Sequence, residues 1–175
     1  TTGVTRVNIA DTANAVAQTV SGLETGATVS LLEDANASQT IDTVAGATLT
    51  VLSSVVKGGG ALVVTDAANV TLTANLASSD LVAVTLDALD TTALTVKSTG
   101  VLDIDTGLVT STDKLETLTL TSDTATGVVI MSDLADADSL TSLTVTAVGG
   151  DITLGEVGGT IGAGSGSGEA LATVT

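Results

Sequence analysis

A short apolar–polar–apolar pattern returns along this chain at intervals of about 20–25 residues, and it constrains the fold more than any other feature. Each copy has the alternation and the Val, Ile, Leu and Thr content of a half-buried β-strand. The copies are Val7-Asn8-Ile9, Val29-Ser30-Leu31, Leu49-Thr50-Val51, Val70-Thr71-Leu72, Leu94-Thr95-Val96, Leu118-Thr119-Leu120 and Leu143-Thr144-Val145. A repeat of this length cannot bury its own apolar side chains, so the copies must stack on one another.

A second series of strand signatures lies between the members of the first, at a similar period. Its members are Ile41-Asp42-Thr43, Leu62-Val63-Val64, Val84-Thr85-Leu86, Leu102-Asp103-Ile104, Val128-Val129-Ile130 and Ile152-Thr153-Leu154. The separators are short and rich in Gly, Asp and Ser, which favours turns over crossover helices. We therefore predict an all-β parallel β-helix, or β-solenoid, of about seven coils of 20–25 residues with two main strands per coil.

Stacking of the first series predicts two ladders of side chains about 4.8 Å apart. One is buried, and consists of Leu49, Val70, Leu94, Leu118 and Leu143. The other is exposed, and consists of Thr50, Thr71, Thr95, Thr119 and Thr144. A flat Thr-x-Thr array of this kind also raises ice binding as an interpretation, but Leu52 and Lys97 interrupt its second rank.

The alternative architecture is a solenoid of the leucine-rich-repeat type. The segment from Leu115 to Asp123 fits the pattern L-x-x-L-x-L, and the following repeat nearly fits it, with Leu140, Leu143 and Val145. Earlier repeats lack the leading Leu, and two strands per repeat favour the β-helix.

The chain of 175 residues is expected to be a single β-solenoid, residues 1–175, that is a segment of a longer chain, and residues 158–168 are expected to form a Gly/Ser-rich loop or linker.

Composition excludes several classes of function. The chain has 20 acidic and four basic residues, a net charge of -16, and no His, Cys or aromatic residue. Proteins bind nucleic acids and anionic membrane surfaces through clustered Lys and Arg residues, and they bind single-stranded nucleic acids also through aromatic stacking. Neither nucleic acids nor membrane surfaces are therefore expected partners. No segment is apolar enough to insert in a membrane. Without His or Cys the usual nucleophile–base pairs are missing, so we predict that the protein is not an enzyme.

Repeated LTVT and LTLT strands in an acidic, Cys-free background, with the opening Gly3-Val4-Thr5-Arg6-Val7-Asn8-Ile9, resemble the surface-layer (S-layer) lattice proteins of Gram-negative bacteria that are exported by type I secretion. The resemblance extends over nearly the whole chain. It implies a right-handed β-solenoid, a secreted protein at the extracellular bacterial cell surface, self-assembly into a two-dimensional array, and dependence on calcium. The G-G-x-G-x-D calcium motif of many such proteins is absent from this sequence.

Acidic residues gather before the first-series strands, in turns where calcium could find oxygen ligands. Asp66 and Asp90 each lie four residues before their strand signature, so stacking should bring their carboxylates onto neighbouring coils. The candidate calcium ligands are Asp87, Asp90, Asp113, Asp133, Asp136 and Asp138. The group of Asp133, Asp136 and Asp138 is the densest.

The outward positions of the second series predict a contact face, because Val63 and Val129 would be exposed apolar residues there. The apolar runs Val55-Val56 and Val128-Val129-Ile130-Met131 also favour a face that packs on a neighbouring domain or subunit. Self-association, or packing on neighbouring domains of the same protein, is therefore expected. The leading hypothesis is a rigid, self-associating scaffold of an S-layer, stabilised by calcium. The alternative is an adhesin stalk or ligand-binding β-solenoid of a secreted surface protein, with a cell-surface glycan as its partner.

Overall fold

The computed structural model is all-β in the residues that it describes, which are 3–9, 17–31, 38–53, 61–74, 81–87, 90–105, 114–123, 128–131, 139–154 and 173–174. The described residues include no helix. The strands are β1 (Arg6–Ile9), β2 (Gln18–Leu23), β3 (Ala27–Leu31), β4 (Gln39–Ser53), β5 (Ala61–Ala74), β6 (Leu81–Asp87), β7 (Ala93–Ser98), β8 (Val101–Asp105), β9 (Thr117–Ser122), β10 (Val128–Met131), β11 (Ser142–Ala147), β12 (Asp151–Leu154) and β13 (Thr173–Val174). All of them pair in parallel.

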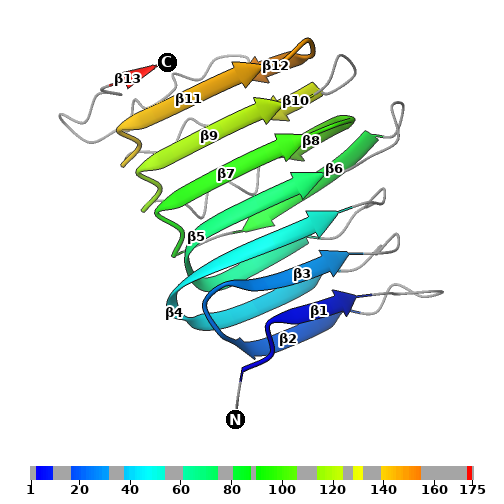
Figure 1. Cartoon of the computed structure of the whole chain (residues 1–175), viewed down its shortest axis with the longest axis vertical. Coiled ribbons are helices and arrows are strands. Elements are labelled where there is room, and N and C mark those ends of the chain that lie inside the picture. Colours follow the sequence, from blue (N-terminus) through cyan, green and yellow to red (C-terminus); the bar gives the residue numbers. More distant parts are fainter. Residues whose placement is uncertain are drawn as a thin grey trace.

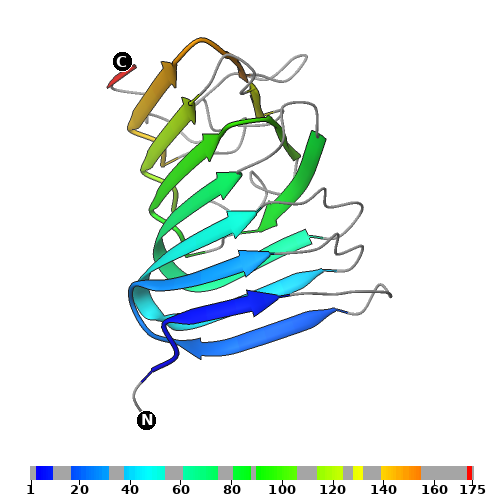
Figure 2. The same cartoon turned by 45° about the vertical axis from the view of Figure 1, so that its right-hand side comes forward.

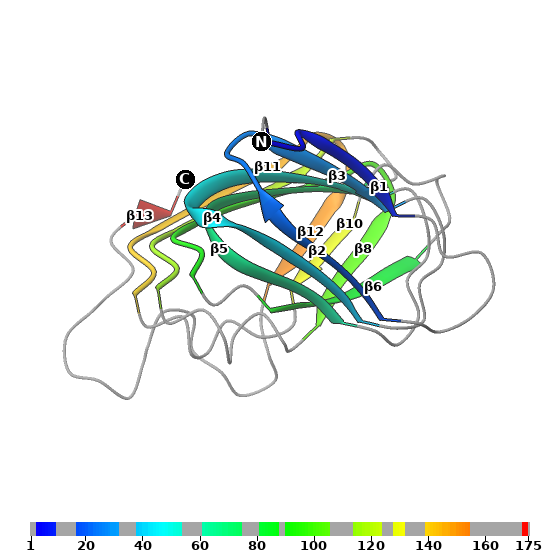
Figure 3. The ribbon, with the colours of Figure 1, turned by 90° about the horizontal axis from the view of Figure 1, so that it is seen from below.

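The strands form two parallel ladders, and the chain passes from one to the other (Figures 1 and 2). The first ladder contains β1, β3, β7, β9, β11 and β13, and the second contains β2, β6, β8, β10 and β12. The long strands β4 and β5 belong to both ladders, because each bends from the second ladder into the first, as the view along the stack shows (Figure 3). Two strand ladders joined in this way confirm a β-solenoid and favour it over the leucine-rich-repeat alternative.

The number of coils is smaller than predicted. The described residues form about three turns of solenoid, whereas the sequence repeat predicted about seven. The prediction assigned one complete coil to each member of the first strand series. A signature is one strand, however, and a turn also requires the connections between the ladders, many of which lie outside the described residues.

Both long strands bend at a residue with a left-handed backbone. In β4 the bend ends at Gly46, with φ 76°, and in β5 it lies at Asp66, with φ 66°. Glycine adopts this conformation without steric cost, and Asp is among the few other residues that tolerate it. The bend of β4 is also longer, because Asp42 and Ala47 pair with Thr65 and Ala67, which have only Asp66 between them.

The core lies between the two ladders and is built from small aliphatic side chains. The predicted buried ladder is confirmed: Leu49 pairs with Val70, and the register continues through Leu94, Leu118 and Leu143, all of them at most 2% exposed. Buried residues of the second ladder, including Ile41, Leu62 and Val64, belong to the same cluster. The alternation of buried and half-buried residues in β7 and β9 is the period-2 pattern from which the strands were predicted.

Four pairings are shifted by two residues from the aligned strand signatures. Val29 pairs with Val51 rather than with Leu49, which pairs with Ala27. In the second ladder, the shifted pairs are Ile41 with Val64, Leu62 with Leu86, and Val84 with Ile104. Because side chains in a strand alternate with period 2, a shift of two residues keeps every side chain on its predicted face.

The pairing at Val129 is shifted by one residue. Val129 pairs with Leu102 and with Ile152, whereas the aligned strand signatures would pair Val128 with both. The side chain of Val129 lies outside the described part of the structure, so its outward position stays a prediction. The predicted loop at 158–168 lies outside the described residues.

Candidate functional site at the coil corners

The candidate site lies at the corners, the segments through which the chain enters each strand of the first ladder. The corners of β5, β7, β9 and β11 place successive residues in the same phase, four positions before the central buried residue of each strand. These residues are Asp66, Asp90, Lys114 and Ser139. The predicted stacking of Asp66 and Asp90 on neighbouring coils is thereby confirmed, and Lys114 follows them in the same file.

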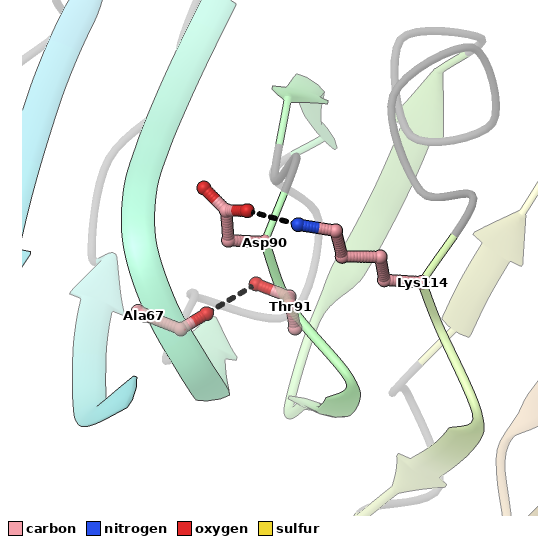
Figure 4. Close-up of polar contacts among 4 residues, drawn as sticks. All are labelled: Ala67, Asp90, Thr91 and Lys114. Atoms are coloured by element: carbon pink, nitrogen blue, oxygen red, sulfur yellow. Dashed lines mark hydrogen bonds and ion pairs between the residues drawn. The ribbon is translucent and has the colours of Figure 1, made fainter. Parts of the chain in front are cut away.

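Hydrogen bonds between coils hold the corners in this stack. The buried hydroxyl of Thr91 donates to the carbonyl oxygen of Ala67 at 3.0 Å (Figure 4). The amide nitrogen of Thr92 donates to Ala68 O at 2.9 Å, and that of Thr117 donates to Thr92 O at 3.0 Å. The backbone N–H groups at the corners thus find their hydrogen-bond acceptors on the neighbouring coil. This pairing fixes the position of each corner residue.

The charged groups at this corner form an ion pair. Lys114 Nζ lies 2.5 Å from Asp90 Oδ1, and both side chains remain partly exposed (Figure 4). The hydrogen bond from Lys114 lowers the pKa of Asp90 below its ordinary value. Desolvation of the carboxylate raises this pKa, whereas the charge of Lys114 and a hydrogen bond from the backbone of Asp66 lower it further. The same bond and the charge of Asp90 raise the pKa of Lys114.

The corner holds an ion pair in this structure, and calcium binding at Asp90 stays a prediction. Calcium binds six to eight oxygen ligands, whereas here the carboxylate of Asp90 already has an ammonium group as its partner. Among the residues whose placement is described, no three acidic side chains come together in a group that could hold a metal. An ammonium group at this position balances the carboxylates, so the corner resembles a structural ion pair more than a metal centre.

The other predicted ligands are only partly placed. Asp87 is the last residue of β6 and pairs with Val63 in register. Asp113, Asp133, Asp136 and Asp138 lie outside the described residues. Calcium binding at the group of Asp133, Asp136 and Asp138 therefore stays a prediction.

Sequence reasoning missed the role of Lys114, although the signal was present. Lys114 lies four residues before Leu118, the same interval that separates Asp66 from Val70 and Asp90 from Leu94. Because Asp90 and Lys114 occupy the same position in successive repeats, an acidic residue lies beside a basic one at this corner. The prediction considered only the acidic residues.

The outward face of the first ladder is the second feature that the sequence singled out, and we call it the hydroxyl face. Its central file runs in register through Thr28, Thr50, Thr71, Thr95, Thr119 and Thr144. The next file is Ser30, Leu52, Thr73, Lys97, Thr121 and Thr146. The interruptions at Leu52 and Lys97 therefore fall where they were predicted, within an otherwise polar uncharged array.

Among the residues that the structure describes, no helix is long and apolar enough to cross a membrane.

A scan against models of protein families, a search of curated proteins and a search of solved structures each found no match.

Proposed function

We propose that this chain is a rigid scaffold segment of a self-associating surface protein of the S-layer kind. The observation that supports this most is the uninterrupted register of the first ladder. Each of its strands from β3 to β11 pairs in parallel with the next, and the buried file continues through all of them. Such a stack transmits load along its axis through backbone hydrogen bonds, which is what a scaffold requires.

The chemistry of the chain supports a structural role over a catalytic one. The sequence contains no His, Cys or aromatic residue. The charged groups of Asp90 and Lys114, at the corner of β7 and β9, form an ion pair in contact with solvent. It links two neighbouring coils, and because the pair is exposed to solvent its contribution to stability is small.

Self-assembly is tested by electron microscopy of the purified chain with and without millimolar calcium. We expect ordered sheets or filaments when calcium is present and dispersed particles after chelation. A chain that stays monomeric under both conditions would contradict the scaffold proposal. If that monomer binds glycans or cells, the adhesin or ligand-binding alternative is supported instead.

A further inference from the structure

A third file of outward residues widens the hydroxyl face. It lies two residues before the central file on each strand, and it is in register from β4 to β11. Its members are Thr48, Asn69, Ala93, Thr117 and Ser142. The strands that present the three files lie side by side in one ladder (Figure 1). The hydroxyl face is therefore a two-dimensional array of side chains rather than a single stripe.

Interruptions in one file leave hydroxyl groups in the other two. In β4, for example, Leu52 interrupts the last file, but Thr48 and Thr50 remain. Among β3, β4, β5, β7, β9 and β11, only β7 presents fewer than two hydroxyl groups at outward positions, because Ala93 and Lys97 stand on it. The array of hydroxyl groups thus extends across all of these strands.

Charge is nearly absent from this face. The chain has 20 acidic residues, yet the described first-ladder segments of β3, β4, β5, β7, β9 and β11 place no carboxylate at an outward position. Lys97 is the one charged residue at these positions. The nearest acids lie beyond the strand ends, as Asp123 does after β9. A broad uncharged surface on a chain with a net charge of -16 separates this face from the rest of the molecule.

The geometry of the face matches an ordered layer of water. Neighbouring strands lie about 4.8 Å apart, and alternate residues of one strand are about 6.6 Å apart in the perpendicular direction. Both distances are close to repeat distances of water molecules on planes of hexagonal ice. A hydroxyl group both donates and accepts hydrogen bonds, as water does. We propose that the hydroxyl face binds the surface of an ice crystal.

Rigidity makes such an array effective. Threonine is β-branched and stiff about χ1, and the central residues Thr95 and Thr119 are half-buried between their neighbours. The hydroxyl groups are therefore held in place before they meet the ice, so that little side-chain freedom is lost on binding. Lys97 has the opposite effect, because an ammonium group is strongly hydrated and orders water around itself.

The test compares the same substitution on and off the face. Thr119→Lys places a long charged side chain at the centre of the array, whereas Thr19→Lys changes an exposed residue of β2 in the second ladder. Each variant gains one positive charge, so both change the net charge from -16 to -15. The measurement is thermal hysteresis, the gap between the melting and freezing temperatures of a single ice crystal in the protein solution. Circular dichroism verifies that each chain is folded.

We expect the unmodified chain to show thermal hysteresis and to shape the growing crystal. Thr119→Lys should lose most of this hysteresis, and Thr19→Lys should keep it. Lys97→Thr should increase it, because this substitution removes the charge from the face and gives β7 a second hydroxyl group.

Three results would overturn the proposal. The first is an unmodified chain without hysteresis, both with and without calcium. The second is equal hysteresis in Thr119→Lys and Thr19→Lys, which would place ice binding on another surface. The third is a chain without hysteresis whose ordered sheets are dispersed by Thr119→Lys, which would make the hydroxyl face a contact between copies. Each of these results leaves the scaffold proposal standing, since electron microscopy tests that proposal separately.

Discussion

Asp66 and Asp90 occupy equivalent positions on adjacent coils but serve different purposes. Asp66 forms the bend of β5 with a left-handed backbone, and its backbone hydrogen-bonds to the carboxylate of Asp90. Asp90 also receives the ammonium group of Lys114 from the following coil. Equivalent corner positions thus have different roles. Asp66 sets the path of the backbone, whereas Asp90 balances charge between coils.

The ion pair predicts how the pKa of Asp90 responds to its partner. Replacing Lys114 with Met removes the donor and the positive charge, so the pKa of Asp90 should rise toward its ordinary value. Carboxyl carbon chemical shifts, followed through a pH titration by NMR, measure this change.

The sign of the linked stability follows from these directions. Because folding lowers the pKa of Asp90, its contribution is present above the unfolded pKa of an aspartate and is lost as pH falls through the lower folded value. Because folding raises the pKa of Lys114, its contribution is present below 10.5 and is lost as pH rises through the folded value. If the Lys114→Met chain shows the same acid dependence of stability as the unmodified chain, the pair has no role in stability.

At the scale of the strand, the inward files hold the fold together and the outward files tolerate change. Two neighbouring residues of β9 illustrate this difference. Leu118 is fully buried, whereas Thr119 is half-buried on the outer side. The amide nitrogen of Asp123, just beyond β9, donates to Ser98 O at 2.9 Å, so the strand is tied to β7 through its backbone as well as its core side chains.

Leu118→Ala should lower the free energy of unfolding by about 2–5 kcal/mol, because it leaves a cavity between two other buried leucines of the same file, Leu94 and Leu143. Thr119→Ala is the matched control one residue away. It should cost less than about 1 kcal/mol, since it changes only strand propensity and an outward contact. Urea denaturation measures both values, and equal losses in the two variants would contradict the assigned faces.

At the scale of the whole molecule, charge is distributed by architecture. The acidic residues of the described strands belong to the second ladder, and others lie at corners of the first, such as Glu116 and Asp123. A solenoid stacks equivalent positions of successive coils close together, so acid in equivalent positions repels unless a cation intervenes. Lys114 is such a cation for one corner, and calcium is the cation expected for the predicted group at Asp133, Asp136 and Asp138.

Calcium should therefore raise the melting temperature of the chain, and a chelator should lower it. Replacing Asp133, Asp136 and Asp138 together with Asn should remove the response to calcium without abolishing folding. A variant with Asp90→Asn is the control, because Asp90 is ion-paired with Lys114, and it should keep the full response. Calorimetry of the three chains measures the shifts, and a melt that ignores calcium in the unmodified chain would contradict the prediction.

The sequence by itself determined which segments are strands and, in most of them, which residues face inward. Both are local properties, since alternation along a strand follows from the period of the backbone. Leu49, Val70, Leu94, Leu118 and Leu143 were identified as one buried file on this basis, and the register confirms it.

Only the tertiary structure decided the registers between coils, the number of turns, and the partner of each charged corner. Register depends on the length of each bend, as the different bends of β4 and β5 show, and the pairing of Val129 with Leu102 is shifted by one residue from the aligned strand signatures. The pairing of Asp90 with Lys114 joins residues 24 positions apart, and it exists because the corners stack. Such contacts between coils are set by the path of the chain in space, which local sequence patterns do not specify.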